Sequence, residues 1–285
     1  RMAPWHNRIV AGAFLVALLA VSGCSYFGSG EEDVPLDQIP PNEIYTTAEA
    51  KLEAGDPEEA ADLFSEVERL YPYSEWAQRA AIMSAFSYHK ARMYEESRAT
   101  AQRYLDFYPA SEDAGYAQYI IALSFYDQID DVGRDQGLTF QALQALRVAV
   151  ERYPDSEYTK SALLKFDLAL DHLAAKEMEI GRYYLKKGHY AAAINRFRVV
   201  VEDFQTTTHT PEALHRLVEA YLSLGLNEDA RTAGAILGHN FQSTDWYHDS
   251  YVLLTGKGIS LEYAQAKGDG WLARFYRLVL RGEWL

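Results

Sequence analysis

The chain has 285 residues and contains no cysteine other than Cys24. An intramolecular disulfide is therefore excluded. Basic residues are also scarce, because 27 Lys and Arg stand against 41 Asp and Glu and give a formal net charge of −14. A surface of this charge repels phosphate backbones, so the composition argues against nucleic acid as a partner.

Residues arranged for catalysis or metal binding are lacking as well. His215 and Glu219 are four residues apart on a predicted helix, but no third ligand is near, and a solvated helix face is the favoured interpretation. The carboxylates between Asp127 and Asp135 do not have the spacing of an EF-hand, which favours a solvated loop. A nucleophile elbow is missing, and Thr255–Gly258 lacks the earlier glycine of a phosphate loop. We therefore expect no metal, no cofactor and no enzymatic activity.

Only one long apolar run precedes the rest of the chain, from Ile9 to Val21, and it follows the basic residue Arg8. The run is too short to span a bilayer comfortably and has the length of the apolar region of a secretory signal. It ends in Val21-Ser22-Gly23-Cys24, with small residues before the cysteine. The sequence therefore predicts a signal peptide over residues 1–23.

The four residues that end with Cys24 resemble the lipobox of bacterial lipoproteins. In such proteins the cysteine thiol takes a diacylglycerol, and cleavage frees its amine for a further acyl chain such as palmitate. Several acyl chains on one residue give stable membrane anchoring. The resemblance implies lipidation of Cys24, and Ser25 after it favours the outer membrane. The alternative is a plain signal peptide with a chance cysteine.

The remaining sequence divides into three parts. Residues 24–41 are rich in Gly, Ser, Pro and acidic residues without periodicity, which predicts a lipidated N-terminus and a flexible tether. Residues 42–242 contain a recurring pair of amphipathic helices, and residues 243–285 form a C-terminal helical extension. We expect an all-α superhelical solenoid of about five helical hairpins.

The fourth copy, residues 177–205, is the clearest and resembles the tetratricopeptide (TPR) pattern. Small residues at Gly181 and Ala193 allow its two helices to approach closely, and Phe197 fills the space between hairpins. Three prolines that each follow a tyrosine end the second helices of the first three copies: Pro72, Pro109 and Pro154. The third copy is longer, and its extra residues lie between its helices, from Tyr126 to Gln136.

Two stretches narrow the pattern further. Both resemble the BamD (ComL) family of outer-membrane assembly lipoproteins. The first stretch is Pro40-Pro41-Asn42-Glu43-Ile44-Tyr45. The second is the inserted loop that ends in Arg134-Asp135-Gln136, together with the later segment Tyr153-Pro154-Asp155-Ser156-Glu157-Tyr158. The resemblance covers roughly residues 9–242. Gly137 and Gln205 depart from the family pattern at turns where proline is frequent.

This resemblance implies a scaffold in β-barrel assembly, attached to the outer membrane by its lipid and facing the periplasm. Its partners would be the periplasmic domains of a BamA-type insertase, other assembly lipoproteins and unfolded outer-membrane protein peptides. Asn195 and Arg196 match a segment whose arginine contacts the insertase, although an exposed arginine is often simply solvated. The rival function is a TPR lipoprotein adaptor that regulates peptidoglycan hydrolases.

Tyrosines are frequent, with 21 in the chain. Four of them are candidates for a substrate-peptide groove: Tyr45, Tyr88, Tyr116 and Tyr119. Because aromatic residues at helical spacing also build cores, the alternative is that these side chains are buried.

The C-terminal extension contains a predicted amphipathic helix with five apolar residues on one face: Leu272, Phe275, Tyr276, Val279 and Leu280. Three arginines share the opposite face. The helix could cap the open end of the solenoid, bind a partner, or lie in a membrane interface.

Overall fold

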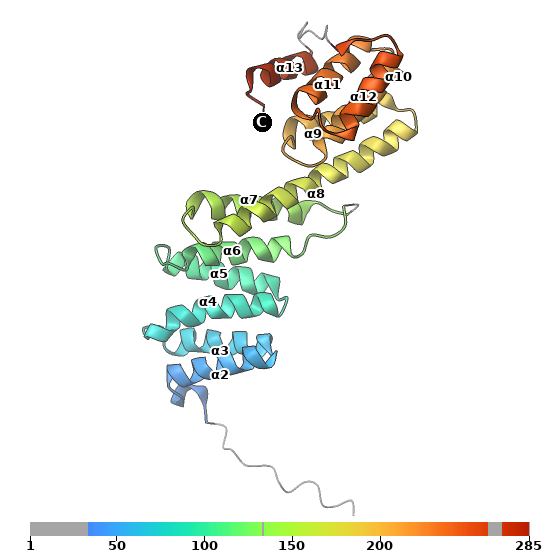
Figure 1. Cartoon of the computed structure of the whole chain (residues 1–285). Helices are drawn as coiled ribbons and strands as arrows, with labels where there is room; N and C mark the ends of the chain where they lie inside the picture. The colour runs from blue at the N-terminus through green and yellow to red at the C-terminus, as the bar shows by residue number, and fades with distance from the viewer. Residues whose placement is uncertain (1–33, 133, 262–269, 285) are drawn as a thin grey trace, which may run out of the picture. The chain divides into compact units, whose positions relative to one another are not determined.

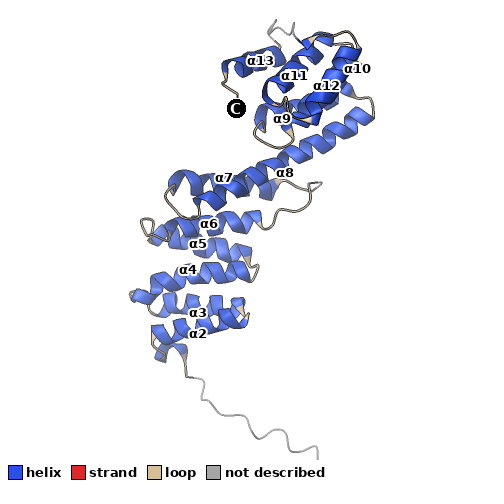
Figure 2. Ribbon diagram, viewed as in Figure 1, coloured by secondary structure: helices blue, strands red, loops and turns tan. Residues whose placement is uncertain are grey.

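Helices are the regular elements of the described part of the chain (Figure 2). The computed structural model describes residues 34–132, 134–261 and 270–284. The described residues contain helices and turns but no strand, so the predicted all-α class is confirmed.

The chain divides into two units, of which the first is Arg1–Pro40. Its described residues begin at Val34 and contain one short 3-10 helix, η1 (Leu36–Gln38). The predicted signal peptide, residues 1–23, and the predicted lipidation site Cys24 lie outside the described residues. Both therefore stay predictions.

The second unit, Pro41–Leu285, consists of helices that follow one another in antiparallel pairs (Figure 1). In chain order they are α2 (Pro41–Ala54), α3 (Pro57–Leu70), α4 (Glu75–Lys90), α5 (Tyr94–Phe107), α6 (Ala114–Tyr126), α7 (Gly137–Arg152), α8 (Thr159–Lys186), α9 (Tyr190–Asp203), α10 (Thr210–Ser223), α11 (Asn227–Asn240), α12 (Asp245–Gly256) and α13 (Trp271–Arg281).

The first hairpin shows why these residues form these elements. Gly55 adopts φ +90°, which glycine tolerates and which lets the chain reverse after α2. Pro57 then stands in the first turn of α3, where its missing N–H is not needed. Glu58 and Glu59 follow in the same turn, where the helix dipole favours negative charge.

The packing order gives two layers. Each helix from α2 to α11 packs against the next helix in the chain, and the first helices of successive hairpins also pack against one another. Neighbouring first helices approach each other more closely than the second helices α3 and α5 do. This arrangement confirms the predicted solenoid of TPR-like hairpins.

Helix α8 is longer than the sequence pattern predicted. The fourth copy was expected to begin near Glu177, but α8 already begins at Thr159 and runs for 28 residues without a glycine or proline before Gly181. Near its middle, α8 buries Ala169 and Leu173 beside Leu143 of α7. Its second half joins the core of the last hairpins. The one helix therefore serves two successive cores.

The turns between hairpins share one construction. An aromatic residue ends the second helix, and its carbonyl accepts the backbone N–H of a serine or threonine three residues later. This occurs five times, at N···O distances of 3.0–3.2 Å: Tyr71 with Ser74, Tyr108 with Ser111, Tyr153 with Ser156, Phe204 with Thr207, and Phe241 with Thr244. Since the fourth turn forms with Gln205, the proline is dispensable there.

The extension 243–285 begins as another hairpin would. Helix α12 follows the fifth of these turns, and Thr244 caps it by accepting the N–H of Tyr247 at 3.3 Å. After α12 the chain turns at Gly258 with φ +74°, as it does after other first helices at Gly188 and Gly225. Helix α12 thus continues the series of first helices.

Helix α13 packs against α11 and buries four of its five predicted apolar residues. Trp284 adds to this core by edge-to-face contact with Phe275 at 4.9 Å between ring centroids. Leu280 was expected on the same face, but 55% of it is exposed. The structure therefore agrees with the interpretation of α13 as a cap. Among the described helices, none has the length and apolar character needed to cross a membrane.

Candidate functional site

The predicted partner-binding residues lie on α9, whose position is set by close packing on α8. Ala193 is fully buried, and Phe197 lies directly against Gly181. A Cβ atom at Gly181 would lie 2.4 Å from Cε1 of Phe197, so only glycine fits this approach. The roles predicted for Gly181 and Ala193 in spacing the two helices agree with these contacts. Phe197, which was predicted to fill the space between hairpins, packs against Gly181 within its own hairpin.

Arg196 lies at the edge of this hairpin and is half-exposed. Its Nη1 donates to the carboxylate of Glu177 on α8, at 3.1 Å to Oε2 and 3.4 Å to Oε1. The side chain of Arg196 is 42% exposed and that of Glu177 is 20% exposed. Asn195, beside it, is exposed. Glu177 was absent from the sequence-based site, because a pair between two helices depends on their packing.

The α8–α9 hairpin, which carries Arg196, is basic although the chain as a whole is acidic. Residues 159–203 contain eight Lys and Arg against six Asp and Glu, a formal net charge of +2, whereas the whole chain carries −14. Arg182 on the same hairpin is paired with Glu212 of α10 at 2.9 Å. The α8–α9 hairpin is therefore suited to an acidic partner.

Two of the four tyrosines predicted to line a peptide groove are core residues. Tyr45 of α2 is 9% exposed and contacts Phe64 and Trp76, each at 5.0 Å between ring centroids. Tyr119 of α6 is 7% exposed. Burial raises the pKa of both hydroxyls above its usual value. The alternative interpretation, core packing, describes these two positions.

Tyr116 and Tyr119 are brought together by a third tyrosine. Tyr158 stacks on Tyr119 at 5.4 Å and lies 4.5 Å from Tyr116, measured between ring centroids. Tyr116 also lines a hollow at the turn before α8 that includes Tyr153 and Glu157. Burial raises the pKa of Tyr116 above its usual value. A groove shared by all four tyrosines stays a prediction.

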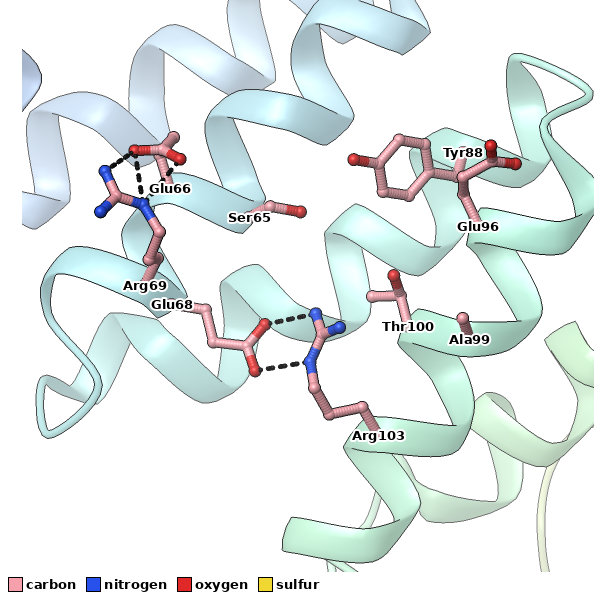
Figure 3. Close-up of a pocket in the computed structure, with 9 residues that line it drawn as sticks. All are labelled: Ser65, Glu66, Glu68, Arg69, Tyr88, Glu96, Ala99, Thr100 and Arg103. Carbon is pink, nitrogen blue, oxygen red and sulfur yellow. Dashed lines mark hydrogen bonds and ion pairs between the residues drawn. The ribbon is translucent and has the colours of Figure 1, made fainter.

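Tyr88 of α4 lines a different hollow, which we call the α3–α5 groove (Figure 3). The groove has a volume of about 520 Å³ and is open to solvent. Its walls come from α3 and α5, and we define it by six of its lining residues: Ser65, Glu68, Tyr88, Glu96, Thr100 and Arg103. Burial raises the pKa of the Tyr88 hydroxyl, and so does its hydrogen bond to Asp62.

One end of the α3–α5 groove is closed by an ion pair between its walls. Arg103 donates from Nε and Nη2 to the two carboxylate oxygens of Glu68, at 3.1 and 2.8 Å. The hydrogen bond to Glu68 raises the pKa of the guanidinium further. The sequence alone did not reveal this pair, since the two residues are 35 positions apart and only the spacing of α3 and α5 brings them together.

The histidine considered as a metal ligand has another environment. His215 is only 4% exposed, and its Nδ1 lies 2.9 Å from Oγ of Ser250 on α12. The expectation of a solvated helix face was wrong for His215, because α12 covers it. Among the described residues, no group of three or more His, Cys, Asp or Glu side chains is placed to hold a metal ion.

Comparison with known proteins gives a consistent result. A family model described as outer membrane lipoprotein, YfiO, matches residues 37–236. A Caulobacter vibrioides protein named outer membrane protein assembly factor BamD is 47% identical over 260 residues, which covers 91% of this chain and 84% of the relative.

Two further relatives carry the same name. The Rickettsia prowazekii protein is 37% identical over 85% of this chain and 95% of its own length. The protein of Neisseria meningitidis serogroup A is 29% identical over 78% of this chain and 88% of its own length. The match includes nearly all the hairpins described above, so the chain belongs to the YfiO family of outer membrane lipoproteins.

Proposed function

We propose that this chain is an outer-membrane protein assembly factor that works as a scaffold. The observation that carries this proposal is the near full-length similarity to relatives named outer membrane protein assembly factor BamD. Their name describes assembly and not catalysis, which supports a non-enzymatic role. The solenoid supports it too, because stacked hairpins provide extended surfaces for other chains.

The proposed attachment to the membrane is a lipid on Cys24. The lipobox-like residues before it and the family description support this anchor. The hairpins would then face the periplasm, held at the outer membrane by the tether. Cys24→Ala should leave the protein in the soluble periplasmic fraction or uncleaved. Unchanged mass and unchanged membrane retention would contradict the anchor.

The proposed docking surface for the periplasmic domains of a BamA-type insertase is the part of the α8–α9 hairpin around Arg196 and Asn195. Arg196 is half-exposed, it is oriented by Glu177, and it lies on a hairpin with a net positive charge. An acidic side chain on the insertase could therefore bind Arg196 while Glu177 continues to hold it. Other assembly lipoproteins would use further surfaces of the solenoid.

The docking proposal is tested by charge reversal. Arg196→Glu should weaken binding to the isolated periplasmic domains at least tenfold, since an interfacial charge left without its partner costs about 2–5 kcal/mol when desolvated. Lys160→Glu is the matched control, because Lys160 is exposed on the same hairpin away from Arg196. Equal binding by both variants and the unaltered chain would contradict the proposed surface.

The rival function, an adaptor of peptidoglycan hydrolases, predicts other partners. Affinity purification from crosslinked outer membranes, followed by mass spectrometry, separates the two. Recovery of an insertase barrel and unfolded outer-membrane proteins supports the assembly function, whereas recovery of a hydrolase without the barrel contradicts it.

A further inference from the structure

Helix α13 differs in charge from the acidic chain to which it belongs. Its four buried residues face α11, so the opposite side of the helix is turned outward. That side carries three arginines, which fall within roughly 60° of one another at 3.6 residues per turn, and α13 contains no acidic residue: Arg274, Arg277 and Arg281. Arg274 and Arg281 are exposed. Helix α13 therefore presents an outward basic face in a chain of net charge −14.

The start of α13 reaches α9, the helix that carries the proposed docking residues. Cζ of Arg198 on α9 lies 4.8 Å from the centroid of the Trp271 ring on α13. Asn195 is exposed, and residues one and three positions after it on a helix flank it on opposite sides. The outer face of α9 thus has Arg196 at one edge and Arg198 at the other. Helix α13 begins where this outer face ends.

Arg274 continues the same surface along α13. It stands three residues after Trp271, which places it one helical turn further on and beside it. Arg281 follows two turns later on the basic face, with 60% of its side chain exposed. The α8–α9 hairpin has a net charge of +2 and α13 has +3, so positive charge extends from one element to the other.

A protein surface suits this basic face better than a membrane does. A helix that lies in a membrane interface inserts its apolar face among the lipids, but that of α13 is already part of the core. The net charge of −14 also opposes an approach to anionic headgroups. An acidic protein surface needs only the outward guanidinium groups, and its charge complements both α13 and the α8–α9 hairpin.

We propose that α13 extends the docking surface of α9, so that one acidic face of the insertase's periplasmic domains meets Arg196 and, beyond it, the arginines of α13. This inference rests on the proposed docking function, because it adds a second element to the same surface. Exposed charges at the rim of an interface mainly accelerate the encounter of two proteins. Helix α13 therefore raises the rate of association, whereas Arg196 holds the complex once it has formed.

The test measures rates of association and dissociation for the full chain in detergent on the immobilised periplasmic domains of the insertase. The variant combines Arg274→Glu with Arg281→Glu. We expect its association rate to fall at least about tenfold at low ionic strength, with the dissociation rate changed less than about twofold. The difference should shrink as salt is added, because exposed charges are screened. Arg196→Glu should instead raise the dissociation rate.

Two control variants separate the basic face from general effects. Lys160→Glu combined with Lys257→Glu makes the same change in net charge at exposed positions outside α13, and it should slow association by less than about threefold. Arg274→Lys combined with Arg281→Lys keeps the charge and should associate as the unaltered chain does. Hydrogen exchange in α13 verifies that the helix stays folded in each variant.

The inference is overturned if the reversed variant associates as fast as the unaltered chain while Arg196→Glu weakens docking. It is also overturned if either control variant slows association as much as the reversed variant does. Native mass spectrometry with phosphatidylglycerol in the detergent tests a lipid ligand. Lipid adducts that the reversed variant loses, together with unchanged docking, would also overturn the inference. Failure of the proposed function would look different, because Arg196→Glu would then dock as the unaltered chain does.

Discussion

The first two hairpins and the α8–α9 hairpin have the same internal construction but opposite net charge. Residues 41–107 contain 13 Asp and Glu against seven Lys and Arg, a net charge of −6, whereas residues 159–203 carry +2. Inside, both regions use a buried alanine and a buried phenylalanine at equivalent places: Ala60 and Phe64 on α3, Ala193 and Phe197 on α9. Packing therefore fixes the hairpin, while its surface charge is left to select a partner.

The largest expected effect is a loss of stability in the α8–α9 region that leaves the first two hairpins intact. Phe197→Ala removes a side chain with no exposed area and should lower the free energy of unfolding by about 3–5 kcal/mol. Because each hairpin contacts mainly its neighbours, the loss should be confined to α8–α13. Hydrogen exchange would then show weakened protection there and retained protection in α2–α5. Phe107→Ala, at a position that is 69% exposed, is the control and should change stability by less than about 0.5 kcal/mol.

A second variant tests the same close packing of α8 and α9 by placing a larger side chain between the two helices. Ala193→Leu should cost about 1–3 kcal/mol, since the fully buried methyl group leaves no room for a larger side chain. Ala191→Leu on the exposed face of α9 is the matched control. Urea denaturation measures both. Equal midpoints would mean that the hairpin is not spaced by Ala193.

The third prediction concerns acid. Burial lowers the pKa of His215 below 6.5, with Arg216 acting in the same direction and Glu219 and Asp249 opposing it. Since the folded-state pKa lies below the unfolded one, the contribution to stability is complete above about pH 6.5. It is lost as the pH falls from there to the folded-state pKa, because the unfolded chain takes up the proton first. Each unit of difference is worth about 1.4 kcal/mol.

Melting temperatures above and below pH 6.5 measure this effect. When the pH is lowered through this range, the α10–α12 region of the unaltered chain should lose stability. The His215→Gln variant should lose less stability over the same pH change. The first two hairpins, observed by hydrogen exchange, should not share this particular loss. An equal loss in both proteins would place the acid sensitivity elsewhere.

The smallest effect is expected at the α3–α5 groove. Glu68→Gln removes one charge of the pair with Arg103, whose side chain is 42% exposed, so stability should fall by no more than about 1 kcal/mol. Urea denaturation measures the change. A fall well above about 1 kcal/mol would contradict the expectation that a half-exposed ion pair contributes little to stability.

Much of the fold can be predicted from local sequence patterns. Predictions from these patterns were wrong where the outcome depended on residues far away in the sequence. Gly55, the prolines after tyrosine and the alternation of small and aromatic residues predict each hairpin, because they act within one or two turns of helix. The start of α8 was not predicted. No glycine or proline between Thr159 and Gly181 marks where the third copy ends and the fourth begins, and the burial of α8 depends on both α7 and α9. The burial of His215 was likewise decided by α12.

The sequence by itself determined the helical class, the hairpin frame and the family, because periodicity and turn residues act over short distances. Tertiary structure alone decided which tyrosines are buried, that Arg196 is held by Glu177, and that Glu68 meets Arg103 across a groove. These outcomes depend on how far apart two helices lie and which faces they turn to each other. That spacing is the sum of many packed side chains along the solenoid, and no single segment encodes it.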